Sequence, residues 1–310
     1  MITQTFILIL GLVLLGVGSS LLVEGAASTA VMFAVRPVIV GLTIVSFATS
    51  APELLVSLVA AVKGSGGISI GNILGSNVIN IALVLGISAI IKPVTIKDQI
   101  IKIEIPYMIL ISCIFWLLCM DSNIGQADGV ILIILLIVFL IYGVITAKEK
   151  NGDTNHVKLS SLRIFKNILF IILGIIMLAY GANFVVQEAI IIAQKIGLSQ
   201  TFIGISVVAF GTSLPELATS AVAAARGESD ISVGNVVGSN LFNICLVMGV
   251  VGIFNPMSID NNLHGFQFPF MIFICFLLGF VAFVNRGIGK RNGSLFIILF
   301  FVYIFISYLN

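Results

Sequence analysis

Charged residues are scarce in this 310-residue chain, in which Asp, Glu, Lys and Arg together make up 9% of the sequence. Hydrophobic residues make up 59%, and the mean hydropathy is +1.23. So little charge leaves too little polar surface to cover a soluble protein of 33.0 kDa. The composition therefore predicts an integral membrane protein whose surroundings are the lipid bilayer, and it gives no sign of a soluble domain, a nucleic-acid partner or a protein partner.

The residues of soft-metal sites and of common hydrolases are also missing from the expected membrane interior. The two histidines, His156 and His264, fall in a linker and a loop, and the four cysteines form no C-x-x-C pair. There is no H-E-x-x-H or G-x-S-x-G motif, so an intramembrane enzyme is not expected. The cysteines are expected to be buried apolar residues; they are Cys113, Cys119, Cys245 and Cys275.

Long apolar runs are abundant. A membrane-spanning helix needs about 20 mostly apolar residues, and the chain offers about ten such stretches. The sequence therefore predicts an all-α polytopic membrane protein. The first stretch lacks the flanks of a removable signal peptide and is taken as a span. The expected spans are 6–28, 38–62, 69–91, 103–120, 128–147, 165–190, 201–225, 231–253, 267–285 and 293–309.

The basic residues predict the orientation. If the polar linker 148–164 is cytoplasmic, every Lys and Arg except Lys63 and Lys195 lies on the cytoplasmic side. Basic residues favour that side of a membrane, so both termini are expected outside, in the plasma membrane of a prokaryote.

The two halves are duplicates. Shifting the chain by 163 positions aligns VGLTIVSFATSAPELL with IGISVVAFGTSLPELA, and ISIGNILGSNVIN with ISVGNVVGSNLFN. We expect one repeat of five helices in 1–147, a cytoplasmic linker in 148–164 and a second repeat in 165–310. An odd number of spans inverts the second copy, an architecture typical of transporters.

Glu53 and Glu216 occupy equivalent places in the repeats, each inside an apolar span. A carboxylate there costs about 2 kcal/mol or more unless something pairs with it, and no Lys or Arg lies in the middle of any span. A bound cation is the simplest partner. Two protonated glutamates in structural hydrogen bonds are the alternative.

Each glutamate follows a helix-breaking run, ATSAP before Glu53 and GTSLP before Glu216. Proline has no N–H to donate, so carbonyls one turn earlier are released to bind something else. The released carbonyls are expected between Ser46 and Thr49 and between Ala209 and Thr212. The hydroxyls of the same turns are predicted as further ligands, and they belong to Thr49, Ser50, Thr212 and Ser213.

The following span of each repeat carries a polar stripe. Spacings of three and four residues place its polar side chains on one helical face, and small-x-x-x-small glycines let the helix approach the glutamate helix closely. Ion ligation is expected for Ser76, Asn80, Ser239 and Asn243, and packing for Asn72, Asn77, Asn235 and Asn240.

An all-oxygen site with two negative charges suits a hard cation. Calcium accepts about six to eight oxygens in flexible geometry, whereas magnesium demands a tight octahedron. The residues therefore favour Ca²⁺, with smaller Na⁺ sites in the same cluster, both as transported ions and not as cofactors.

The segments SFATSAPE with GNILGSNVIN, and AFGTSLPE with GNVVGSN, resemble the paired alpha repeats of the sodium/calcium exchanger family. The resemblance implies Ca²⁺ on Glu53, Glu216 and the carbonyls of Thr49 and Thr212, with Asn80 near the centre. It implies Na⁺ sites completed by Ser50, Ser76, Ser213, Ser239 and the Ala209 carbonyl. It also implies that the first and sixth spans are long sliding helices, with Glu24 and Glu188 near their ends. Asn243 departs from relatives that carry an aspartate there.

The resulting hypothesis is an electrogenic Na⁺/Ca²⁺ antiporter that works by alternating access. A proton-coupled antiporter remains an alternative because a buried glutamate can bind H⁺ in place of Na⁺. A channel is a third possibility, which the inverted repeat and the closed site of two carboxylates argue against.

Overall fold

The helices lie where the apolar stretches predict them. The computed structural model describes residues 2–64, 66–146, 161–195 and 209–309. Within these residues eight helices are long and apolar enough to cross a membrane, and a bent pair of helices makes a ninth candidate. The all-α polytopic fold is thus confirmed, while the start of the seventh expected span lies outside the described residues.

The first half runs through α1 (Ile2–Met32), α2 (Pro37–Val40), η1 (Gly41–Val45), α3 (Ser46–Thr49), α4 (Ala51–Val62), α5 (Gly66–Ile79), η2 (Asn80–Leu85), α6 (Gly86–Ile91), β1 (Val94–Thr95), η3 (Ile100–Glu104), α7 (Ile105–Leu118), β2 (Asn123–Ile124) and α8 (Gln126–Ile145). The second half runs through α9 (Ser161–Lys195), α11 (Ala209–Thr212), α12 (Leu214–Arg226), α13 (Ser229–Leu241), η5 (Phe242–Met248), α14 (Gly249–Phe254), β3 (Met257–Ser258), α15 (Asn262–Gly265), α16 (Gln267–Asn285), β4 (Gly287–Ile288) and α17 (Lys290–Leu309). Most of the expected linker lies outside the described residues, and α9 begins at Ser161. The η elements are short π-helices, which the sequence pattern did not predict.

Two small antiparallel sheets join the halves. β1 of the first half pairs with β4 of the second, and β2 of the first pairs with β3 of the second. A shift of 163 carries Val94 of β1 onto Met257 of β3, so the two sheets are related by the same duplication as the helices. At Gly287 a Cβ atom would lie 2.5 Å from the carbonyl oxygen of Val94, which explains why this strand carries glycine.

The two helices with the polar stripe lie at the centre of the protein. In their most apolar windows, 89% of the span Gly66–Ile91 and 83% of the span Ser229–Phe254 is buried. The outer spans formed by α1, α8, α9 and α17 are only 22% to 33% buried in the corresponding windows. Lipid covers the exposed side of an outer helix, whereas the central pair provides the enclosed setting that a buried polar site requires.

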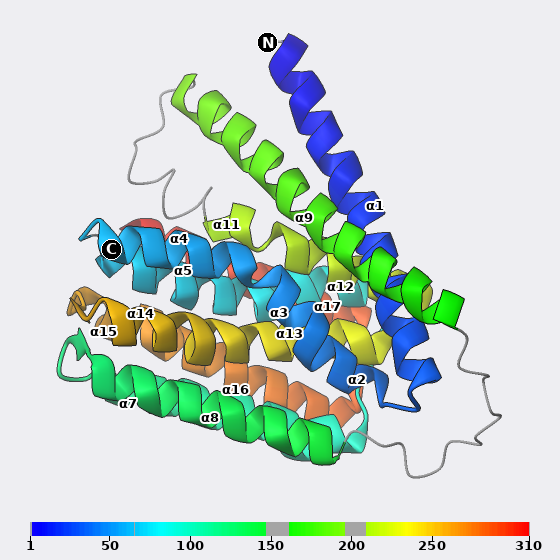
Figure 1. Ribbon diagram of the computed structural model, residues 1–310. Coiled ribbons are helices and arrows are strands. Elements are labelled where there is room, and N and C mark those ends of the chain that lie inside the picture. Colours follow the sequence, from blue (N-terminus) through cyan, green and yellow to red (C-terminus); the bar gives the residue numbers. More distant parts are fainter. Residues whose placement is uncertain (1, 65, 147–160, 196–208, 310) are drawn as a thin grey trace.

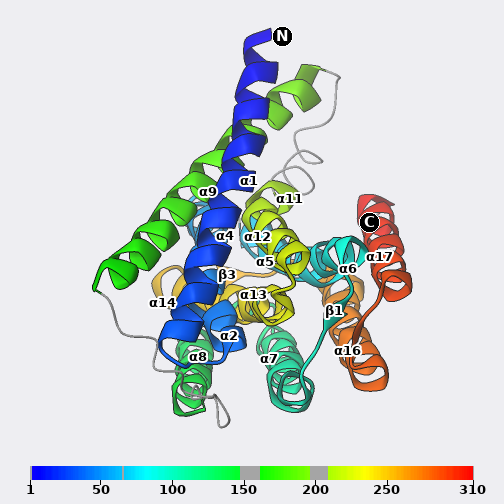
Figure 2. The same cartoon turned by 90° about the vertical axis from the view of Figure 1, so that its right-hand side faces the viewer.

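α1 and α9 form a separate long pair. Figures 1 and 2 show these helices side by side across one face of the bundle, with the N-terminal end of α1 extending beyond it. Glycines allow the close approach, since a Cβ at Gly18 would lie 3.0 Å from the Gly174 carbonyl oxygen. Both helices exceed the predicted spans of 6–28 and 165–190, in the way that the family resemblance implies for the first and sixth helices.

This packing makes a prediction about α1. Gly18→Val should lower the thermal stability of the purified protein by several degrees, because the added side chain meets α9 backbone atoms that cannot move aside cheaply. Gly16→Val is the matched control, because a Cβ at Gly16 has no heavy atom within 4 Å. The measurement is a melting curve in detergent for both variants, and equal melting temperatures would refute the role of the glycine contact.

Candidate ion-binding site

Both halves break a helix just before the glutamate of the repeat. α3 ends at Thr49 and α4 begins after Ser50, with a bend of 43° between the two helical pieces. In the second half α11 ends at Thr212 and α12 begins after Ser213. Ser50 and Ser213 have nearly the same backbone conformation, with ψ of 3° and 5°. Pro52 has no N–H, so it cannot donate to a carbonyl of the preceding turn.

Glu53 and Glu216 are fully buried next to these breaks. Each accepts a hydrogen bond from the other repeat: Ser213 Oγ donates to Glu53 Oε1 at 3.3 Å, and Ser50 Oγ donates to Glu216 Oε1 at 3.4 Å. The ion pairs among the described residues do not include either glutamate. Another buried carboxylate, that of Glu104, differs in lying 3.8 Å from the guanidinium of Arg36. The paired glutamates therefore bring two carboxyl groups together without a counter-charge from the described part of the protein.

The threonines of the breaks are held by asparagines of the opposite repeat. Thr212 Oγ1 donates to Asn72 Oδ1 at 3.3 Å, and Thr49 Oγ1 donates to Asn235 Oδ1 at 3.2 Å. Thr49 Oγ1 also lies 3.3 Å from Ser239 Oγ. The sequence predicted only a packing role for Asn72 and Asn235, and their spacing along the helix could not reveal which residue of the other repeat they contact.

Five predicted ligand oxygens have no partner within the described protein. They are buried side-chain atoms: Glu53 Oε2, Glu216 Oε2, Ser76 Oγ, Asn80 Oδ1 and Asn243 Oδ1. A buried polar atom without a hydrogen bond costs about 1–3 kcal/mol, so their concentration in one place is unfavourable unless something else binds them. Five further buried side-chain oxygens also lack a hydrogen-bond partner in the described protein: Ser69 Oγ, Glu104 Oε1 and Oε2, Thr219 Oγ1 and Gln267 Oε1. The chemistry of the predicted set, with carboxylate, amide and hydroxyl oxygens, fits a hard cation as transported cargo.

The helix geometry at the amides corrects one assumption of the spacing argument. Asn80 begins the π-helix η2, and Asn243 lies in the equivalent π-helix η5. The expected single face assumed an unbroken α-helix, whereas a π-helical turn holds more residues and rotates the side chains beyond it around the helix axis. Short π-helical segments are frequent at functional sites, and here they coincide with the predicted amide ligands.

Ser46 and Ala209 were predicted for their place near the breaks. The hydroxyl of Ser46 donates to the carbonyls of Gly41 at 2.7 Å and Asn235 at 3.1 Å, so it fastens α3 to α13. The hydroxyl of Ser46 is therefore used in packing the two repeats together. Ala209 is the first residue of α11, and the burial of its side chain is outside the described part of the chain.

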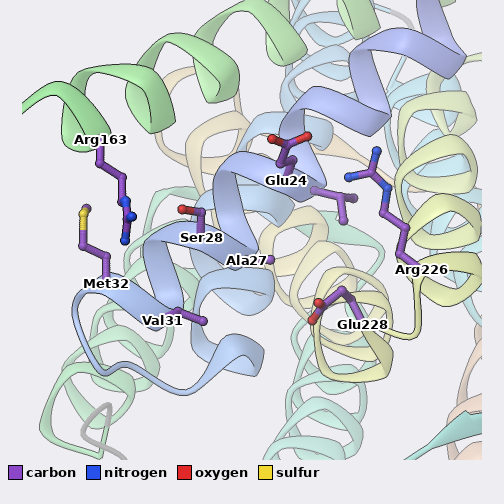
Figure 3. Close-up of a pocket in the computed structure, with 9 residues that line it drawn as sticks. Glu24, Ala27, Ser28, Val31, Met32, Arg163, Arg226 and Glu228 are labelled. Atoms are coloured by element: carbon purple, nitrogen blue, oxygen red, sulfur yellow. The ribbon is translucent and has the colours of Figure 1, made fainter. Parts of the chain in front are cut away.

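A cavity of about 350 Å³ lies at the opposite end of α1 from its N-terminus. Figure 3 shows the charged side chains of Glu24, Arg163, Arg226 and Glu228 around it. Glu24 is about half exposed and accepts a hydrogen bond from Lys166 of α9 at 3.3 Å, which makes it an interfacial charge. The side chain of Glu188 lies outside the described residues.

Other metal-site chemistry finds little support. No group of three or more His, Cys, Asp or Glu residues that could hold a metal occurs among residues 2–64, 66–146, 161–195 and 209–309. His264, which the sequence places in a loop, is engaged by its neighbours: its Nδ1 accepts the indole N–H of Trp116 at 3.1 Å and its ring stacks on Phe268. The oxygen cluster is therefore the feature that an assignment of function must explain.

The family model described as sodium/calcium exchanger protein matches residues 3–144 and 166–309, which is almost the whole of both halves. The chain belongs to the sodium/calcium exchanger family. It is accordingly an integral membrane antiporter of that family and not an enzyme. The boundaries of the family match also fall on either side of the predicted linker.

Relatives of this exchanger cover nearly its full length. The inner membrane protein YrbG of Escherichia coli is 32% identical over 302 aligned positions, covering 93% of each chain. The sodium/calcium exchanger MaX1 of Methanosarcina acetivorans is 30% identical over 344 aligned positions, covering 97% of each chain. The solved structure of the sodium-calcium exchanger NCX_Mj, soaked with 2.5 mM Na⁺ and 0.1 mM Ca²⁺, superposes with a TM-score of 0.86 at 34% identity over 98% of both chains.

The site makes a prediction about the two glutamates. Glu53→Gln and Glu216→Gln should each weaken Ca²⁺ binding to the purified exchanger by about 100-fold, because each change removes one of the two charges that face the cation. Isothermal titration with CaCl₂ in detergent measures the effect. Glu228→Gln, which changes a carboxylate in the turn before α13, is the control and should bind as the parent does. Unchanged affinity in either glutamate variant would contradict the site assignment.

Proposed function

We propose that this exchanger moves Ca²⁺ against Na⁺ through the cluster around Glu53 and Glu216 by alternating access. The observation that carries the proposal is the pair of fully buried carboxylates that bridge the repeats without a counter-charge from the described residues. Two carboxylates neutralise one Ca²⁺, and the unpartnered oxygens supply further ligands of the kind that Ca²⁺ prefers.

The ligand set is proposed from the residues that the structure gathers and from the family resemblance. Ca²⁺ is held by the carboxylates of Glu53 and Glu216 and by backbone carbonyls at the two helix breaks. Na⁺ ions occupy flanking positions after Ca²⁺ leaves, because one cluster of hydroxyl, amide and carbonyl oxygens can be divided among smaller sites. The full proposed set is Ser46, Thr49, Ser50, Glu53, Ser76, Asn80, Ala209, Thr212, Ser213, Glu216, Ser239 and Asn243.

A cavity that reaches the proposed ion site supports alternating access. A cavity of about 380 Å³ lies between α4 of the first repeat and α9, and the predicted ligand Thr212 is part of its wall. Pro52 is partly exposed there, whereas its equivalent Pro215, which also lines the cavity, is buried. In the second repeat α1 packs along α12. Because the repeats are inverted, movement of α1 and α9 across the rest of the protein would exchange these two environments. In the proposed orientation the cavity beside α4 faces outward.

The coupling ion and the charge balance can be tested together. Purified exchanger in vesicles loaded with Na⁺ should take up ⁴⁵Ca²⁺ against its gradient, and three Na⁺ leaving for each Ca²⁺ would move one positive charge outward. An inside-positive potential should therefore accelerate uptake and an inside-negative potential should slow it, since one charge is worth about 2.3 kcal/mol per 100 mV. Uptake that ignores the imposed potential would refute electrogenic exchange.

The same vesicles separate the alternatives. Imposing Na⁺, K⁺ or H⁺ gradients one at a time identifies the coupling ion, and uptake driven by the pH gradient instead of the Na⁺ gradient would establish the proton-coupled antiporter. Calcium flux that needs no counter-ion would identify a channel.

The proposed orientation makes a prediction of its own. With both termini outside and the linker 148–164 cytoplasmic, a cysteine placed at Asp153 should react with an impermeant maleimide only in inverted vesicles. A cysteine at Asn262, in α15, should react only in intact cells, because the basic residues and the odd number of spans per repeat place it outside. Labelling of both positions from one side would contradict the inverted arrangement.

A further inference from the structure

Two equivalent asparagines bond to each other where the repeats meet. Asn77 Nδ2 donates to the backbone carbonyl of Asn240 at 3.4 Å, and Asn240 Nδ2 donates to the backbone carbonyl of Asn77 at 3.3 Å. The two residues are separated by 163 positions, which is the offset of the duplication. This reciprocal pair is therefore symmetric between the two halves, and both side chains are fully buried.

The second N–H of each amide also faces an acceptor. Asn77 Nδ2 lies 3.9 Å from Met271 Sδ, and Asn240 Nδ2 lies 3.7 Å from Met108 Sδ. An asparagine amide has two donor hydrogens on nitrogen and an acceptor oxygen, so a flipped amide would set its oxygen against a carbonyl oxygen and a sulfur. The surroundings thus allow only one orientation of each amide.

That orientation leaves the two amide oxygens to accept hydrogen bonds from the predicted ligands. Asn77 Oδ1 accepts from Asn243 Nδ2 at 3.1 Å, and Asn240 Oδ1 accepts from Asn80 Nδ2 at 3.1 Å. Since the nitrogens of Asn80 and Asn243 are held in this way, their Oδ1 atoms are the ones left without a partner among the described residues.

We propose that Asn77 and Asn240 are positioning residues of the ion site, which hold the carbonyl oxygens of Asn243 and Asn80 toward the cations. The inference deepens the proposed function and rests on it. Without the pair, an amide at position 80 or 243 can rotate by 180° and present its N–H groups, which repel a cation. The pair also selects the residue type, because a side chain at position 80 or 243 must donate a hydrogen bond. Asn243 meets this requirement, whereas an ionised aspartate there would face an acceptor oxygen.

The experiment measures Na⁺-driven ⁴⁵Ca²⁺ uptake by the full chain in vesicles. Asn77→Ala should raise the KM for Ca²⁺ about tenfold, the factor given by one lost hydrogen bond of about 1.4 kcal/mol, with Vmax changed less than about twofold. Asn240→Ala should do the same through the other ligand.

Crossed double variants separate positioning from a merely structural role. Asn243→Ser removes the amide that Asn77 holds, so adding Asn77→Ala to it should raise KM no further. Adding Asn77→Ala to Asn80→Ser should raise KM by the full factor, because Asn80 is held by Asn240. Asn240→Ala should show the opposite pattern. General loosening of the core would affect both backgrounds equally, so each background is the control for the other.

If an alanine variant fails to fold, a milder substitution next to the same asparagine replaces it. Met271→Leu removes the sulfur that faces Asn77 at little cost in volume, and Met108→Leu does so for Asn240. Each should raise KM about twofold in the same crossed pattern. A parent protein without Na⁺-driven uptake would overturn the proposed function. Uptake by the parent together with equal effects in both backgrounds, or with no effect, would overturn the positioning role alone.

Discussion

Two carboxyl groups that are buried next to each other in a membrane protein require a partner, and most of this structure can be understood from that requirement. Glu53 and Glu216 are fully buried, and neither takes part in an ion pair within the described residues. The crossed serine hydrogen bonds satisfy one oxygen of each carboxylate and leave the second oxygen unpartnered within the described protein. Because a desolvated negative charge is so costly, the protein is suited to hold cations and to release one kind only when another replaces it.

The duplication explains how one chain brings such groups together. Each repeat supplies a broken helix with a glutamate and a central helix with a polar stripe, and many of the contacts run between repeats. Ser213 donates a hydrogen bond to Glu53, Asn235 accepts one from Thr49, and Asn77 accepts one from Asn243. The sheets β1–β4 and β2–β3 join the repeats again outside the core. Neither repeat alone would complete the proposed ion site, since predicted ligands of one repeat form hydrogen bonds with residues of the other.

The departures from symmetry are as informative as the symmetry. α1 packs along α12, whereas a cavity separates α9 from α4, although the four helices are equivalent in pairs. The centre around Asn77 and Asn240 keeps its symmetry. The alternating access proposed above would move the outer pair and leave this symmetric centre in place. The glycine contacts between α1 and α9 pack these helices closely against each other, as the proposed movement of the pair requires.

The sequence by itself determined the membrane location and the duplication, and it predicted a set of ligand oxygens. The length of the apolar stretches, the identity between the two halves and the carboxylates inside apolar spans can all be read from the sequence. They predict membrane spans, a repeated fold and bound cations without any knowledge of the tertiary structure. Five predicted ligand atoms proved to be buried and unpartnered within the described residues. The π-helical turns at Asn80 and Asn243 were not predicted, nor were the hydrogen-bond partners of Asn72, Asn77, Asn235 and Asn240. Spacing along a helix shows which residues lie on the same face. Only tertiary packing decides which atoms of the other repeat lie within hydrogen-bond distance of that face, and therefore which way each amide must point.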